Sequence, residues 1–428
     1  MRLMIPKKLI PLIFIALSVF SGVSAQIKTN ISALRQGAVQ SAARHQEMAQ
    51  RLQRLSRQNN WPLLISLKNG NKAVLYGIDP GGRPLYVATN DNIISAATIG
   101  TNQLWPGGST GLNLSGSSPG LKGKLAVWDG GGVRSTHQEL KGRILQKDQP
   151  AALNDHSTHV SGTLIASGVN PAAKGMSFGA QQLVAYDFDS HIPEMYSEAA
   201  NLLISNHSYG TVAGWNFNTD QNRWEFSAAP GDTADYKFGY YSDETQDWDS
   251  IAYNAPDYLI VKSSGNNRDV NGPDVGQPYY RPNSSGVMIP AGNRPAGLSS
   301  NNGYDIIPTY GTAKNILTVG AVYPIPGGYS QPADVVQAEF SSWGPTDDGR
   351  IKPDVVADGI NVLSSISTSD NAYAIYSGTS MSSPAAAGSS FLLQEYYAKL
   401  HGGNFMRSAT LKGLLIHTAD EAGLADGP

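Results

Sequence analysis

Short apolar runs alternate with helical stretches through most of this chain of 428 residues. Runs typical of buried strands lie at 124–128, 182–187, 201–205, 257–262, 315–320 and 354–357. Helical patterns fall between several of them, at 156–167, 192–200 and 245–256, and a further helix is expected at 405–418. Continuous apolar strands that alternate with helices are typical of a parallel sheet buried on both faces. The pattern therefore predicts an α/β fold, with a mostly parallel sheet and helices on both faces.

Two connections in this pattern are unusually long. Residues 214–245 are rich in Trp, Asp, Asn and Tyr, and residues 267–310 are rich in Pro, Gly and Asn. Loops of such length in a compact domain are more often functional than disordered. We expect both to form the rim of a site.

The first 25 residues have the composition of a secretory signal peptide. A basic start with Lys7 and Lys8 precedes an apolar run, Leu9 to Phe20, and small residues at Val23-Ser24-Ala25. This order predicts cleavage before Gln26 and a secreted or extracellular protein, with the periplasm or the cell surface as alternatives. The rest of the chain has no stretch long and apolar enough to span a bilayer. The chain has no cysteine, which for a secreted protein suggests a bacterial source.

Residues 26–96 read as a small α+β unit ahead of the main domain at 97–428. A helical spacing of apolar residues, Ile31, Leu34, Val39, Met48, Leu52 and Leu55, is followed by strand-like runs at 61–67, 73–76 and 84–89. We predict a prosegment, with a permanent N-terminal subdomain as the alternative. The boundary is expected between residues 94 and 123, where Gly, Ser, Pro and Asn accumulate.

Charge is unevenly distributed between these parts. Residues 26–60 hold six Lys/Arg and one Glu, a net charge of +5, and residues 61–428 carry −11. Without the signal peptide the net charge is −6, which argues against nucleic acid or an anionic membrane as the main partner. Complementary charge instead suggests that the basic segment docks on the rest of the chain.

The segment 377–385, Ser-Gly-Thr-Ser-Met-Ser-Ser-Pro-Ala, places a serine between a tight turn and a helix. Ser380 is expected near the first exposed N–H groups of that helix, where developing negative charge is stabilised. Pro384 is expected in the opening turn, because proline disrupts a helix interior. A serine nucleophile needs a neighbouring base and a group that orients that base.

Candidates for both partners occur upstream of Ser380. His156 and His159 lie in Asn154-Asp155-His156-Ser157-Thr158-His159, with a spacing that places the two imidazoles on neighbouring turns of one helix face. A metal site at this pair lacks an evident third ligand. Asp129 ends an apolar run, at the carboxyl end of a predicted strand, where α/β sheets carry functional groups. His137 and His207 are expected at the surface or in loops.

These motifs together resemble the subtilisin-like serine peptidases, the subtilase family, over roughly residues 97–428. The resemblance implies a triad of Asp129, His156 and Ser380, with Asn266 of Ser263-Ser264-Gly265-Asn266 as the oxyanion donor. The order Asp, His, Ser is that of subtilisin. It also implies that substrate is bound by Ser208, Tyr209, Gly210, Ser263, Ser264 and Gly265, with Ser208 to Gly210 pairing as an added strand.

Two positions depart from the family pattern. Gly130 stands where the family usually has a serine or threonine that can bond the aspartate, and backbone N–H groups are the expected substitute. Asp358 stands where the family often has proline, and we expect it to alter a loop without changing the chemistry. The floor of the specificity pocket is expected in the inserted region after Asn267.

The function implied is that of a secreted serine endopeptidase acting on proteins or peptides, with its own prosegment as a partner. The chemistry needs no cofactor. Structural calcium is a further candidate, because the loops 232–249 and 269–274 are rich in Asp; solvated acidic loops are the alternative. Two other functions remain open: a catalytically inactive subtilisin-like binding or adhesion module, and an unrelated serine esterase, although Ser380 does not lie in a Gly-x-Ser-x-Gly motif.

Overall fold

The computed structural model describes residues 29–66, 72–78, 82–89 and 95–422. The signal-peptide prediction lies outside these residues. The main domain is built on seven parallel strands in the order β15-β14-β11-β7-β4-β6-β5. These strands are β4 (Leu125–Asp129), β5 (Ile144–Gln146), β6 (Leu183–Asp187), β7 (Ile204–His207), β11 (Leu259–Ser263), β14 (Leu317–Val322) and β15 (Val355–Asp358). The predicted α/β fold with a parallel sheet is confirmed.

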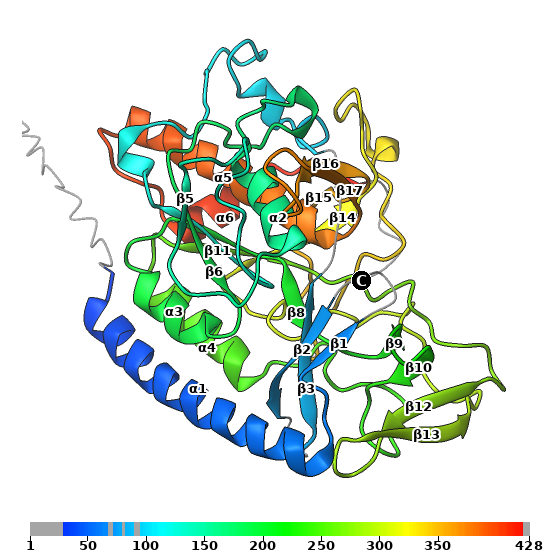
Figure 1. Ribbon diagram of the computed structural model, residues 1–428. Coiled ribbons are helices and arrows are strands. Elements are labelled where there is room, and N and C mark those ends of the chain that lie inside the picture. Colours follow the sequence, from blue (N-terminus) through cyan, green and yellow to red (C-terminus); the bar gives the residue numbers. More distant parts are fainter. Residues whose placement is uncertain (1–28, 67–71, 79–81, 90–94, 423–428) are drawn as a thin grey trace, which may run out of the picture.

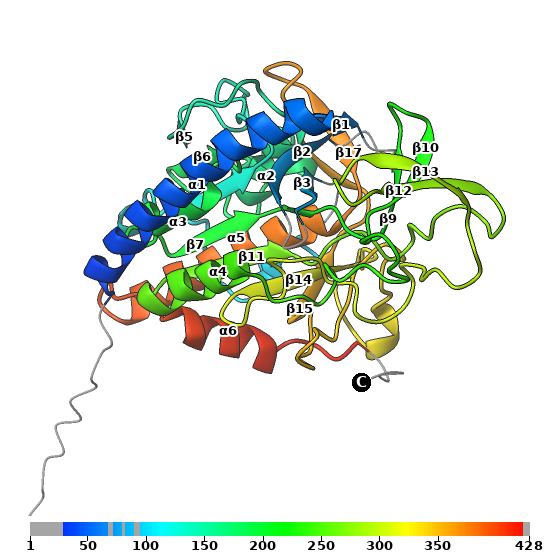
Figure 2. The ribbon, with the colours of Figure 1, turned by 90° about the horizontal axis from the view of Figure 1, so that it is seen from below.

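Helices cover both faces of this sheet because each strand directs alternate apolar side chains to opposite sides. One face packs against α2 (Asp155–Ile165), α5 (Thr379–Leu400) and α6 (Ser408–His417), in a core that includes Val127, Val160 and Phe391. The other face packs against α3 (His191–Glu198) and α4 (Asp243–Asn254), around Trp128 and Trp248. Figures 1 and 2 show the two layers from directions at right angles.

The N-terminal unit has the predicted α+β composition. It comprises α1 (Ile31–Asn59), β1 (Leu64–Ser66), β2 (Lys72–Ile78) and β3 (Pro84–Thr89). The helix begins after Asn30, whose side chain accepts a hydrogen bond from Ala33 N. It ends at Asn60, which adopts the left-handed conformation that favours asparagine at a helix end.

Helix α1 packs lengthwise on α3 and also contacts α4 (Figure 1). Leu34 and Leu52 are buried as the apolar spacing predicts, whereas Ile31 and Val39 are exposed. Close approach of α1 to α3 depends on Gly37, because a Cβ there would lie 2.5 Å from a ring carbon of Tyr196. A small residue at this point, rather than the full apolar stripe, therefore sets the packing distance.

The two long connections are not simple loops. They fold into a separate four-stranded sheet in the order β13-β12-β10-β9. Its strands are β9 (Trp215–Asn218), β10 (Arg223–Phe226), β12 (Pro278–Pro282) and β13 (Met288–Asn293). Trp215, Phe226 and Tyr279 form its buried core. We call this unit the inserted sheet. A hairpin of β16 (Val362–Ser365) and β17 (Tyr373–Tyr376) completes the fold.

Candidate active site

The candidate site lies along the edge of the central sheet at which its parallel strands end. Asp129 ends β4, and His156 follows Asp155, the first residue of α2. Helix α2 begins there because the Asn154 side chain accepts a hydrogen bond from Ser157 N at 3.0 Å. The start of α2 thus places His156 directly against the end of β4.

Asp129 and His156 form a buried pair, with His156 Nδ1 2.6 Å from Asp129 Oδ1. The same carboxylate oxygen accepts hydrogen bonds from Gly130 N at 2.7 Å and from Ser157 Oγ at 3.3 Å. These two donors compensate for the hydroxyl missing at position 130. A carboxylate held in this way orients the imidazole and stabilises its protonated form.

Ser380 lies in the first turn of α5, after Gly378 in an extended conformation. Its side chain is almost fully buried, and its Oγ donates a hydrogen bond to Ser208 O at 3.2 Å. The serine is thus held between the start of a helix and the residue that follows β7. Its own N–H belongs to the first turn, where backbone donors have no helical partner.

Pro384 does not lie in the opening turn, which differs from the prediction; it lies inside α5, four residues after Ser380. Proline has no N–H, so the carbonyl of Ser380 lacks the donor that a regular helix would supply. Ser208 Oγ takes this role at 2.7 Å. Ser208 therefore binds Ser380 twice, through its hydroxyl and through its carbonyl.

Asn266 follows β11 and faces the same helix start. Its Oδ1 accepts hydrogen bonds from Thr379 N and Thr379 Oγ1, both at 2.8 Å. With the carbonyl oxygen fixed by Thr379, the amide N–H₂ is the group left to donate toward substrate. Thr379 Oγ1 in turn accepts a hydrogen bond from Gly265 N at 3.1 Å.

Ser208 is followed by β8 (Tyr209–Thr211), which leaves the central sheet and joins the N-terminal unit. Strand β8 pairs antiparallel with β3, with Ala88 opposite Gly210 and Thr89 opposite Tyr209. Tyr209 and Gly210, two residues of the segment expected to pair with a bound peptide, thus pair with a strand of this same chain.

The predicted substrate-binding residues line a cavity of about 480 Å³, which we call the active-site cavity. Ser208, Tyr209, Gly210, Ser263, Gly265, Asn266 and Ser380 all contribute to it. Ser264 does not; it is fully buried, and its N–H donates to Val319 O at 2.9 Å. Trp215, Phe217 and Trp224 of the inserted sheet form an aromatic wall, as expected for a functional rim.

Three other histidines singled out in the sequence, His137, His159 and His207, are buried. His159 is fully buried, its Nε2 lies 3.1 Å from Val362 O, and burial lowers its pKa to about 3. His137 is fully buried in the loop between β4 and β5, so the expected loop position is confirmed for it. His207 is fully buried in a strand, so the expectation of a surface or loop position was wrong for that residue. His207 ends β7 and stacks on Trp128 with ring centroids 5.1 Å apart.

The segment 232–249, expected as a loop, includes the first half of α4, and its acidic residues Asp235 and Asp249 are bonded to protein groups. Asp249 accepts hydrogen bonds from Lys314 N and Asn315 N, and Asp235 pairs with Lys237 at 2.8 Å. In the part of the chain that the structure describes, no three His, Cys, Asp or Glu residues cluster so as to hold a metal ion. Calcium stays a prediction for melting experiments with a chelator.

Sequence reasoning missed Asn206, a polar residue next to the start of α5. Asn206 Nδ2 donates to Ser208 Oγ at 2.9 Å, and Asn206 Oδ1 accepts from Ser383 Oγ at 2.7 Å. Asn206 is fully buried in β7, between Ser205 and His207, which are also fully buried. A buried amide at such a position needs partners, and that need was the available signal.

Comparison with known proteins decides the family. The chain matches the model of the subtilase family over residues 110–427. The chain belongs to the subtilase family. This membership makes it a serine peptidase and confirms the resemblance drawn from the motifs; it rules out the unrelated serine esterase. The inactive binding module is not favoured.

Individual relatives of this subtilase are more distant. A stretch of 60 residues, 14% of this chain, is 55% identical to C5a peptidase of Streptococcus pyogenes but covers 5% of it. A serine protease/ABC transporter B family protein of Dictyostelium discoideum is 24% identical over 365 residues, 68% of this chain and 20% of that protein. The chain thus spans between a twentieth and a fifth of these curated relatives.

A solved structure shares the fold. The Clostridium perfringens CspB protease matches with a TM-score of 0.51 and 15% sequence identity, over 77% of this chain and 92% of that one.

Proposed function

We propose that this subtilase is a secreted serine endopeptidase that cleaves peptide bonds through an acyl-enzyme on Ser380. His156 takes the proton of Ser380 Oγ as that oxygen attacks the substrate carbonyl. Asp129 keeps the imidazole oriented and stabilises its positive charge. The Asn266 amide and the Ser380 N–H stabilise the oxyanion. His156 then protonates the leaving amine, and water releases the acyl group.

The observation that carries this proposal is the buried pair of His156 and Asp129 at 2.6 Å. Such a pair at the same sheet edge as a serine in the first turn of a helix supplies base, orienting acid and nucleophile together. The alternative, an inactive binding or adhesion module, requires no intact pair of this kind.

Labelling with a fluorophosphonate probe tests the proposal directly. The probe should modify Ser380 in the wild-type protein, the Ser380→Ala variant should stay unlabelled, and only the wild type should digest casein. Absence of labelling in correctly folded protein would support the binding module instead.

We further propose that residues 26 to about 95 are a prosegment that keeps the cleft closed. Strand β3 occupies the edge of β8 on which a substrate strand would pair, with Thr89 opposite Tyr209. A peptide bound by strand addition needs that same edge. The N-terminal segment and substrate therefore compete for one set of backbone groups.

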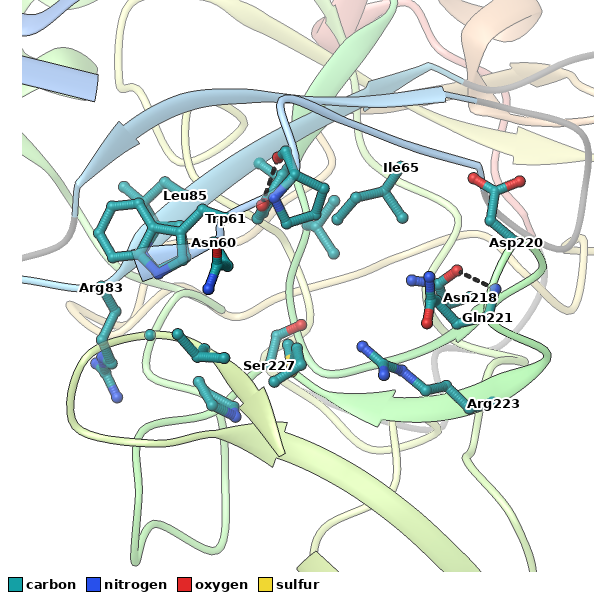
Figure 3. Close-up of a pocket in the computed structure, with 18 of the residues that line it drawn as sticks. Asn60, Trp61, Ile65, Arg83, Leu85, Asn218, Asp220, Gln221, Arg223 and Ser227 are labelled. Atoms are coloured by element: carbon teal, nitrogen blue, oxygen red, sulfur yellow. Dashed lines mark hydrogen bonds between the residues drawn. The ribbon is translucent and has the colours of Figure 1, made fainter. Parts of the chain in front are cut away.

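Contacts outside the cleft support tight docking of this segment. Arg44 Nη2 donates to both carboxylate oxygens of Asp247, at 3.0 Å each. Trp61 is buried, and its Nε1 donates to Ser285 O at 2.9 Å, in the turn between β12 and β13. A cavity of about 290 Å³ remains between Trp61 and Leu85 of the segment and Asn218 and Arg223 of the inserted sheet (Figure 3).

N-terminal sequencing of the secreted, active protein tests this second proposal. A new terminus after residue 94 is expected; Gln26 as the terminus of fully active protein would make the segment a permanent subdomain.

Among the helices of the described residues, none is long and apolar enough to cross a membrane. Proteins or peptides are the proposed substrates.

A further inference from the structure

A lysine is buried beside the nucleophile, and no step of the proposed chemistry uses it. Lys262 is 2% exposed and lines the active-site cavity together with Ser380 and Asn266. It belongs to β11, and its neighbours in the sheet are His207 of β7 and Thr318 of β14. Burial of an ammonium group without a full set of partners is costly, so its presence in a cleft calls for an explanation.

The ammonium group of Lys262 has room for one more partner. Its Nζ donates to Ser263 O at 2.6 Å and to Ser263 Oγ at 2.9 Å. An ammonium carries three N–H donors. Within the described residues, no further acceptor lies within hydrogen-bonding distance of this group. One donor is therefore available to a ligand in the cavity.

The ammonium lies beside Gly210, one of two glycines that line the active-site cavity together with Pro308. A Cβ built on Gly210 would lie 3.9 Å from Lys262 Nζ and 3.9 Å from Pro308 Cγ. A Cβ on Gly265 would lie 3.0 Å from Pro308 Cδ. Pro308 thus borders the space beside both glycines, which we call the slot, and the lysine amine lies at its Gly210 side.

The direction of β3 places the reactive residue of a substrate at this slot. A peptide that pairs antiparallel with β8 passes Thr211, then Gly210 and then Tyr209 as it advances. The next residue of the protein in that direction is Ser208, whose carbonyl accepts the hydrogen bond of Ser380 Oγ. The residue that precedes the cleaved bond therefore lies beside Ser208, which lines the same cavity as Gly210, Gly265 and Lys262.

We infer that Lys262 is a specificity-determining residue that favours a carboxylate side chain, Asp or Glu, immediately before the cleaved bond. This inference rests on the proposed peptidase function. The carboxylate would accept the third N–H of Lys262 and pair with its charge, while Pro308 limits the depth of the slot. The alternative specificity is a large apolar side chain before the cleaved bond, which would pack on the aromatic wall of Trp215, Phe217 and Trp224.

The charges around Lys262 make this preference depend on pH. Burial lowers the pKa of Lys262 to about 7, and the nearby Asp129 raises it. His207 faces the lysine but stays uncharged because burial lowers its pKa well below the usual value. Asp269 also lines the cavity, and it is exposed. The positive charge is thus complete below neutral pH and is lost as pH rises through 7 and above.

The test compares peptides that differ only in the residue before the cleaved bond: Glu with Gln, Asp with Asn, and Leu and Phe. The full chain is allowed to mature, and its active sites are counted with a fluorophosphonate before each assay. At pH 6 we expect kcat/KM to be about 10- to 100-fold higher for the acid than for its amide in at least one pair. Equal rates for both pairs, or a preference for Leu or Phe, would overturn the inference.

Lys262→Met keeps the length of the side chain and removes its charge. The acid preference should disappear in this variant, with Ser380 labelling retained. Lys122→Met makes the same change at an exposed site before β4, and it should leave the preference intact. An acid preference that persists in Lys262→Met contradicts the inference.

A wild-type measurement covers the case in which the variant does not fold. The ratio of acid to amide cleavage should fall at least several-fold between pH 6 and pH 9; a constant ratio argues against Lys262. If no peptide is cleaved and Ser380 is not labelled, the peptidase function itself fails, and that outcome is distinct from cleavage without acid preference.

Discussion

Ser380 and His156 are the residues whose removal should abolish turnover. When residues act as one catalytic unit, removal of any one of them loses nearly the whole rate enhancement. We therefore expect Ser380→Ala and His156→Ala each to lower kcat by about 10⁶. His159→Ala should lower the melting temperature, because His159 is buried and bonded to Val362 O, and should change kcat far less. A larger loss of kcat for His159→Ala in folded protein would reassign the base.

Asn266 accepts the hydrogen bond of Thr379 N, and its amide is the proposed oxyanion donor. An alanine at this position removes both groups. Asn266→Ala should lower kcat by about 10²–10³ through loss of an oxyanion donor, with little change in KM. Asn266→Asp keeps an acceptor for Thr379 N but replaces the amide donor with a negative charge that opposes the oxyanion, so it should be at least as slow. Steady-state kinetics separate an effect on kcat from an effect on KM. A change confined to KM would contradict the role of Asn266 as an oxyanion donor.

Asp358 makes stability depend on pH. It is fully buried at the end of β15, and burial raises its pKa from 3.8 to about 8. Between these values the folded protein holds a proton that the unfolded chain releases, so the free energy of unfolding falls as pH rises from about 4 to about 8. The loss is on the order of a few kcal/mol.

Asp358→Asn should remove this pH dependence. Urea denaturation at pH 5 and pH 8 would measure it: the variant should gain stability over wild type at pH 8 more than at pH 5. Equal gains at both pH values would show that Asp358 does not carry the proton.

At the scale of elements, Ser380 in α5 is fixed by Ser208, the residue that follows β7. Ser208→Ala should leave the Ser380 carbonyl without its donor, at a cost of about 1–3 kcal/mol in the free energy of unfolding. Pro384→Ala restores a backbone N–H that can bond that carbonyl within the helix. The same Ser208→Ala change should therefore cost less in a Pro384→Ala background, as measured by denaturation of the four proteins. An unchanged cost would mean that the two donors are not interchangeable.

The sequence predicts the central strands closely because their apolar runs are continuous. Strands at 125–129 and 259–263 lie within a residue or two of the predicted 124–128 and 257–262. The inserted sheet was expected only as rim loops, because its strands are short and are stabilised by residues distant in sequence. Glu225 pairs in register with Tyr280, for example, and this contact has no local signal.

The site residues also divide into those with a local sequence signal and those without one. Asp129, His156, Asn266 and Ser380 lie in local motifs, so a single sequence identifies them as candidates. Asn206 and Lys262 are buried polar residues near the ends of β7 and β11, and what each contacts depends on how the strands and α5 assemble. Their positions become meaningful only when β7, β11 and α5 are assembled.

At the scale of the whole molecule, the separated N-terminal segment should inhibit the mature enzyme in trans. Basic residues of α1 face a domain of opposite charge, and such charges chiefly raise the association rate. We expect slower association as salt rises, with the rate followed by peptide cleavage in stopped-flow or manual mixing. Arg44→Ala should weaken the salt dependence by removing the pair with Asp247.

A segment variant with Trp61→Ala is the matched comparison. It removes a buried apolar contact, so it should speed dissociation and leave the salt dependence of association intact. No inhibition by the intact segment at any salt concentration would contradict the prosegment proposal.

The pairing of β3 with β8 has a consequence for how dilution affects the enzyme. While the chain is continuous, β3 competes for β8 at an effective concentration of order millimolar, which micromolar substrate cannot match. After a single cut between the two strands, the released segment and the substrate compete for β8 as separate molecules in solution. Occupancy of β8 then depends on how much released segment remains nearby, so spreading the same molecules through a larger volume should by itself raise the activity of each one.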